Sequence, residues 1–173
     1  MPNYSLDETD KRILSFLMKD ARTPLTEIAR DCRISSAAVN QHIKKMKETG
    51  VITGSRVVVK PAALGLNVCA FISVSLSEDN KYAEVVAAFK HVPEVVECHF
   101  VTGRAALLVK VFCLNNEHLM DVLLNTIQRI PYISSTETLL SLDEAFERQV
   151  SVRGTHHPIS DASFPAAKGT LLR

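Results

Sequence analysis

The chain has 173 residues, of which 46% are hydrophobic and 23% are charged, and these values exclude global disorder. The formal net charge is +1, which taken alone argues against a nucleic-acid partner, because such binding depends on neutralising phosphates. The charge is unevenly spread, however: residues 1–60 carry a net +4, residues 61–150 a net −5 and residues 151–173 a net +2. A basic N-terminal block joined to an acidic body indicates two separate tasks on one chain.

The first helix is predicted from a capping box, in which two side chains near a helix start bond to each other's backbone N–H. Two pairs fit this pattern, Ser5 with Glu8 and, two residues later, Asp7 with Asp10. An apolar stripe at helical spacing then continues to a predicted end near Lys19.

Two further helices are predicted before residue 50. In the second, Thr23 is expected as the N-cap and Pro24 as the first helical residue, with an end near Cys32. Ser35 is expected to cap the third helix, and Gly50 to end it. The residues expected in the core between the three helices are Ile13, Leu14, Leu17, Met18, Leu25, Ile28, Ala29, Ile34, Val39, Ile43 and Met46.

A short second helix, a turn of about four residues and a capped third helix form a helix-turn-helix pattern within the basic block. Residues 51–52 and 57–59 are expected to be strands that form a possible wing. The outer face of the third helix, residues 35–48, is expected to enter the major groove, where amides read bases and lysines take phosphates. For any single residue an ordinary solvated helix face is the alternative. The candidate DNA contacts are Ser36, Ala37, Asn40, Gln41, His42, Lys44 and Lys45.

Several short motifs are shared with a known family. They are the run 6–14, then Asp20-Ala21-Arg22, Ile28-Ala29, Ile34-Ser35, Gly50-Val51-Ile52 and the stretch 60–66. As a set they closely resemble the opening of the Lrp/AsnC (feast/famine) transcription regulators. The resemblance implies a DNA-binding domain over residues 1–60 and a hinge at 61–66, and it extends over residues 5–150.

The second block, residues 67–150, is predicted to be a βαββαβ domain of the ferredoxin-like type, so that the whole chain is α+β. The strands are expected near 67–77, 95–102, 105–113 and 133–142. Two helices would cover one sheet face, leaving the other to be buried against another subunit, as Leu139, Leu140 and Leu142 suggest. The resemblance implies an effector-binding and oligomerisation domain that forms dimers, which often assemble into octamers.

The resemblance places the effector site around the turn between the second and third strands. That turn commonly reads Thr-Gly-x-Tyr-Asp, whereas here it reads Thr102-Gly103-Arg104-Ala105-Ala106, so an aromatic and a carboxylate are both replaced by Ala. Thr102, Gly103, Arg104 and Ala106 are the candidate effector-binding residues for an amino-acid-like ligand, and Arg104 could hold a carboxylate. Gly103 has an alternative explanation as a turn glycine with positive φ.

Enzymatic function is the weaker hypothesis. Asp143, Glu144 and Glu147 would share one side of a helix, but nothing else converges on them. Sirohaem decarboxylases resemble these regulators in fold, yet residues 95–104 fit their His-and-Arg segment poorly. The motifs of serine hydrolases, zinc peptidases and phosphate-binding loops are missing from the sequence.

No cofactor and no metal site are expected. The cysteines at 32, 69, 98 and 113 form no CxxC pair and are expected to be reduced and buried in a cytoplasmic protein. His156-His157 lacks a third ligand, and residues 151–173 are expected to form a mobile tail. The sequence lacks a secretory signal and a membrane span.

The sequence therefore predicts a sequence-specific transcriptional regulator in which a homodimer presents two third helices to successive major grooves of double-stranded DNA. A nucleoid-type architectural protein with little site preference is the alternative.

Overall fold

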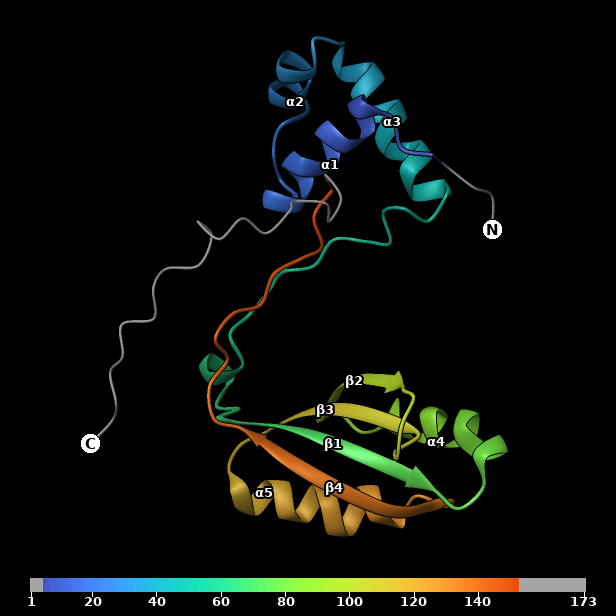
Figure 1. Ribbon diagram of the computed structural model, residues 1–173. Helices are drawn as coiled ribbons and strands as arrows, with labels where there is room; N and C mark the ends of the chain where they lie inside the picture. The colour runs from blue at the N-terminus through green and yellow to red at the C-terminus, as the bar shows by residue number, and fades with distance from the viewer. Residues whose placement is uncertain (1–4, 153–173) are drawn as a thin grey trace, which may run out of the picture. The chain divides into compact units, whose positions relative to one another are not determined.

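The computed structural model describes residues 5–152, and the chain forms two compact units (Figure 1). Of the described residues, the first unit contains 5–56 and 148–152, while the second is Val57–Glu147. Among the described residues, no helix has the length and apolar character needed to cross a membrane. The predicted tail lies, apart from its first two residues, outside the described part of the chain, as does the His156-His157 pair.

The first helix, α1 (Glu8–Lys19), begins at the second of the two expected capping boxes. Asp7 is the N-cap and accepts a hydrogen bond from the Asp10 N–H at 2.7 Å. The Asp10 carboxylate in turn accepts the Asp7 N–H at 3.1 Å. The box of Ser5 with Glu8 is therefore wrong, because the helix starts three residues after Ser5 and Glu8 is its first residue.

The second helix, α2 (Leu25–Cys32), begins one residue later than expected. Pro24 is its N-cap, and the Pro24 carbonyl accepts the Glu27 N–H at 3.0 Å. The expectation that Thr23 caps this helix is wrong, because its hydroxyl donates to the Asp20 carbonyl in the preceding turn.

The third helix, α3 (Ser36–Glu48), begins and ends as the sequence predicts. The Ser35 hydroxyl accepts the Ala38 N–H at 3.1 Å, and Gly50 follows the helix with a φ of +76°. Arg33 adopts a left-handed φ of 57° in the turn between α2 and α3. Figure 1 shows the three helices gathered around a common centre. Seven residues form their buried core: Ile13, Leu14, Ile28, Ala29, Val39, Ile43 and Met46.

The wing strands expected after α3 are wrong. Residues 51–60 form no strand, since no other described segment pairs with them, and a strand needs a partner for its backbone groups. Val57 and Val58 are 77% and 78% exposed. The expected hinge contains a short 3-10 helix, η1 (Pro61–Leu64), which ends at Gly65 with a left-handed φ of 80°.

The second unit is built on a four-stranded antiparallel sheet in the order β2-β3-β1-β4. Its strands are β1 (Val68–Leu76), β2 (Val95–Phe100), β3 (Leu107–Cys113) and β4 (Ile133–Ser141). A 3-10 turn, η2 (Asp79–Lys81), leads into α4 (Tyr82–Phe89) between β1 and β2, and α5 (Asn116–Asp121) follows β3. The predicted βαββαβ order is therefore confirmed, and the fold is α+β.

The helical segment after β3 is less regular than its sequence suggested. Asn115 caps α5, which continues as a π-helical segment (Val122–Thr126) and a 3-10 turn (Ile127–Arg129). The wider turn of the π-helical segment shifts the phase of the apolar stripe. As a result Val122 is buried, whereas Leu123 is only partly buried.

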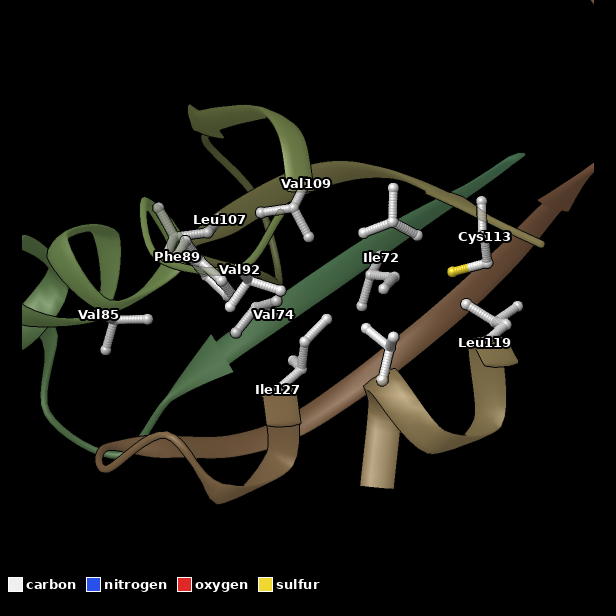
Figure 2. Packing of buried hydrophobic residues seen from close by; sticks show 13 residues of the cluster. Ile72, Val74, Val85, Phe89, Val92, Leu107, Val109, Cys113, Leu119 and Ile127 are labelled. Carbon is white, nitrogen blue, oxygen red and sulfur yellow. The ribbon is translucent and has the colours of Figure 1, made fainter. Parts of the chain in front are cut away.

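The core of the second unit lies between one face of the sheet and its two helical segments (Figure 2). In β1 the alternation places Ala70, Ile72 and Val74 in this core, and their neighbours on the opposite face. Phe89 on α4 and Ile127 close the core from the helical side. The outer sheet face is left without a covering layer among the described residues of this unit.

Candidate nucleic-acid interface and effector hollow

The outer face of α3 carries most of the predicted DNA contacts. Ala37, Asn40, Gln41, Lys44 and Lys45 are exposed, because Val39, Ile43 and Met46 hold the opposite face in the core. Ser36 is half-buried beside the N-cap. The five exposed residues form a surface that begins with small and amide groups and ends with lysines.

His42 has a different environment from the other candidates on α3. One ring nitrogen, Nδ1, lies 2.7 Å from a carboxylate oxygen of Asp10, whose side chain is 1% exposed. This contact joins α3 to the first turn of α1, 32 residues earlier. His42 therefore sets the position of α3 as well as bordering its outer face, a role that sequence spacing did not reveal.

Asp7 lies beside the same pair, so that two carboxylates and one imidazole come together. The donor set would suit a divalent metal. Each carboxylate already accepts a backbone N–H of the capping box, and Asp10 also contacts His42. These bonds account for the cluster as a structural link between α1 and α3.

A hollow of about 720 Å³ in this unit lies against α1 and α2. Arg30 and Arg33 line it together with the ion pair of Arg12 and Asp31. The hydrogen bond from the Arg12 guanidinium holds the pKa of Asp31 below its ordinary value. Glu27 also lines the hollow, so that two carboxylates accompany its three arginines, and none of the predicted contact residues lies in it.

The turn between β2 and β3 borders a small hollow of about 180 Å³ on the second unit. Arg104 and Ala105 line it from the turn, and the remaining lining residues come from β1 and β4. In the register of these strands Ser73 lies opposite Glu137 and Ser75 lies opposite Ser135. Thr136 completes the lining, but its hydroxyl accepts a hydrogen bond from Gln128 at 2.9 Å.

Only Arg104 of the four predicted effector residues lines this hollow. Thr102 and Gly103 are exposed outside it, and Gly103 has a φ of +121°, as a turn glycine requires. Ala106 donates its N–H to the Val74 carbonyl and packs against the core.

Sequence reasoning missed the strand residues that complete the hollow. The available signal was the alternation of Ser73 and Ser75 with apolar residues in β1, matched by polar residues along β4. That pattern shows which residues share the outer face, but only the strand order β1-β4 brings them together.

The other chemical candidates do not assemble into a site. Asp143, Glu144 and Glu147 are exposed and lie outside any helix. All four cysteines are free, but only Cys113 is fully buried, whereas the sequence favoured burial of all of them. Burial raises the pKa of the Cys113 thiol to about 11, which keeps it protonated and unreactive at neutral pH.

Comparisons with known proteins give a family match for each of the two units. Residues 6–53 match a winged helix-turn-helix DNA-binding family, and residues 69–151 match the Lrp/AsnC ligand binding domain. Regulatory protein AsnC of Escherichia coli is 37% identical over 150 residues, which cover 87% of this chain and 99% of that protein. The transcriptional regulator FL11 of Pyrococcus abyssi is 36% identical over 138 residues, covering 80% of this chain and 90% of FL11.

Solved structures give the same result. The structure of E. coli AsnC has a TM-score of 0.82 at 36% identity and covers 86% of this chain and 99% of that one. A feast or famine regulatory protein from M. tuberculosis, solved in complex with L-methionine, has a TM-score of 0.79 at 25% identity, covering 85% and 99% of the two chains.

A helix-turn-helix unit followed by a ferredoxin-like ligand-binding unit defines a class of DNA-binding transcriptional regulators, and this chain is one of them. Its extended similarity to AsnC and FL11 places it further: the chain belongs to the Lrp/AsnC family.

Proposed function

We propose that α3 is the recognition helix of a sequence-specific regulator, and that its exposed face reads base edges in the major groove. The observation that carries this proposal is the division of α3 into a fully buried face and an exposed face bearing Asn40, Gln41, Lys44 and Lys45. Amides early in the helix can pair with adenine, and lysines further along can contact phosphates. Ala37 and Ser36 are small enough to let the helix approach the bases.

A homodimer would present two such helices, one helical turn apart, to an inverted repeat. The outer face of the sheet supports this assembly, because its centre is apolar: Phe71 lies opposite Leu139, and Phe112 lies on the neighbouring strand. Lys110 is 15% exposed there, between the Phe71 and Phe112 rings and 3.6 Å from Glu97. An apolar centre with paired charges suits a protein interface.

We further infer that the second unit binds a small amino-acid-like effector, which changes the assembly state and hence operator occupancy. The relative solved with L-methionine supports this step, as does the hollow beside Arg104. Dimers would assemble further, to octamers in the fullest form, so that several operator sites are held together. The protein would act in the cytoplasm without catalytic activity, in keeping with relatives named as regulatory proteins.

Replacing Gln41 by Ala tests the reading role of α3. Gln41→Ala should change the ranking of operator variants, because removing one bidentate base contact costs about 1–3 kcal/mol at the base pair that it reads. Affinities for a set of single-base operator variants, measured at fixed salt in competition with bulk DNA, give the ranking.

Gln128→Ala, in the second unit, is the control and should leave the ranking unchanged. An unaltered ranking for Gln41→Ala would contradict the assignment of Gln41. Equal affinity of the unsubstituted protein for operator and bulk DNA would favour a nucleoid-type architectural protein instead.

A further inference from the structure

The last described residues of the chain return to the helix-turn-helix unit (Figure 1). After β4, residues 142–151 are exposed throughout, so this stretch buries little side-chain surface. Val152 is then half-buried and packs against the core that α1, α2 and α3 share. Apolar contact therefore resumes at one residue, and it lies within the first unit although the whole second unit intervenes in the sequence.

The helical core that receives Val152 is small. Only seven of its described residues are buried, and small units bury a low fraction of their surface, which makes their stability marginal. One further apolar side chain is therefore a substantial addition to such a core. The additional side chain comes from the other end of the described chain, beyond the segment that holds α1 to α3.

Within the described residues, the chain passes between the two units twice, at Arg56–Val57 and at Glu147–Arg148. On the second unit these connections start from neighbouring strands, because Cys69 near the start of β1 is paired with Ser141 at the end of β4. Paired strands lie about 4.8 Å apart, so both connections leave the sheet at almost the same place. A unit held by two connections has fewer accessible positions than a unit held by one.

From this topology we propose that residues 148–152, the C-terminal strap, complete the helix-turn-helix core and form, with the connection before β1, a double tether that restricts the positions of α3. The consequence for DNA rests on the proposed dimeric function. Once one recognition helix is bound, a restricted partner helix meets the second half-site at a higher effective concentration. The strap would therefore strengthen binding to an inverted repeat without touching DNA.

Hydrogen exchange of the full chain tests the packing of Val152. Val152→Ala should raise the exchange rates of the slowest α1 to α3 amides about fivefold, the effect of removing two half-buried methyl groups. Amides of β1 and β3 should be unaffected, because they belong to the other unit. Val150→Ala is the matched control: the same change at a side chain that is 86% exposed should leave all of these rates unaltered.

Val152→Asp tests the tether, because a charge at this position opposes packing against the apolar core. Affinities are measured for duplexes that carry either the complete inverted repeat or one half-site. The variant should bind the complete repeat about fivefold more weakly, since the effective concentration of the second helix falls. Binding to the single half-site should be unchanged, because α3 itself is intact. Val150→Asp, which adds the same charge at the exposed position, should bind both duplexes normally.

The proposal is overturned if Val152→Ala exchanges like Val150→Ala, or if Val152→Asp binds the complete repeat as tightly as Val150→Asp. Equal weakening on both duplexes would also overturn the tether, because it would show that Val152 only stabilises the helical fold. Failure of the proposed function is distinguishable: the unsubstituted chain would then show no preference for the inverted repeat over a half-site, and the exchange rates would still decide whether the strap packs.

Discussion

Asp10 shows how much one buried polar side chain can organise. It closes the capping box of α1 and also contacts His42 on α3, although its side chain is almost fully buried. Burying a carboxylate is costly unless hydrogen bonds compensate, and here backbone and imidazole groups provide them. The same residue therefore fixes the start of one helix and the position of the helix that we propose enters DNA.

Replacing Asp10 by Ala should destabilise the first unit by roughly 1–3 kcal/mol, because it removes a helix cap and leaves a partly buried imidazole without its partner. Hydrogen exchange of the α1 and α3 amides measures the loss within this unit alone. Glu8→Ala is the control: the Glu8 side chain is 89% exposed and, within residues 5–152, forms an ion pair with Lys11 alone, so its loss should cost at most about 1 kcal/mol. Equal loss of protection in both variants would contradict the role given to Asp10.

At the scale of elements, α3 carries the side chains proposed to read bases in its early turns and those proposed to contact phosphates in its later turns. Its first turns present small and amide side chains, and its later turns present Lys44 and Lys45, with Lys44 lying 3.8 Å from Glu48. An exposed ion pair of this kind contributes little to stability, so the lysine can exchange Glu48 for a phosphate at small cost. In the proposed complex the helix would therefore combine sequence-dependent and sequence-independent contacts along one surface.

Replacing Lys45 by Ala should weaken binding to every DNA sequence by a similar factor and reduce the slope of log K against log salt by about 1, because one phosphate contact is lost. Titrations at several salt concentrations with specific and nonspecific duplexes provide the measurement. Lys90→Ala, an exposed change of equal charge after α4, should leave the slope unaltered. A slope unchanged by Lys45→Ala would mean that this lysine contacts no phosphate.

At the scale of the whole molecule, the outer sheet face is the surface through which we propose that the chain assembles. The register places Leu139 beside Phe71 on that face, whereas Leu140 lies opposite Ala70 on the helix-facing side, and Leu142 lies beyond the strand. The three leucines that the sequence grouped together therefore do not form one patch. Leu139, with the two phenylalanines, is the part that a second subunit would cover.

Replacing Leu139 by Asp should shift the assembly toward single chains, since a charge buried against Phe71 would lack a partner. Light scattering at several protein concentrations gives the molar mass. Leu124→Asp is a matched control, because Leu124 is 52% exposed against 56% for Leu139 but lies on the helical layer. An assembly state unchanged by Leu139→Asp would place the dimer interface elsewhere.

The sequence by itself determined the order of elements and most of the core. Periodicity is a local property, so Val39, Ile43 and Met46 could be assigned to the buried face of α3, and the cap at Ser35 followed from neighbouring residues. Local signals failed where competing local bonds existed, as at Thr23, whose hydroxyl bonds the preceding turn. They also failed at residues 51–60, where a strand requires a partner that the chain does not provide among its described residues.

The tertiary structure alone decided which distant residues meet. The contact between His42 and Asp10 depends on the packing of α3 against the start of α1, and the hollow of Arg104 and Glu137 depends on β4 pairing with β1. The phase shift that buries Val122 arises from a π-helical turn within the packed layer. Sequence patterns report which face a residue occupies, but the partner across that face is fixed only when helices and strands pack, because those contacts join positions far apart along the chain.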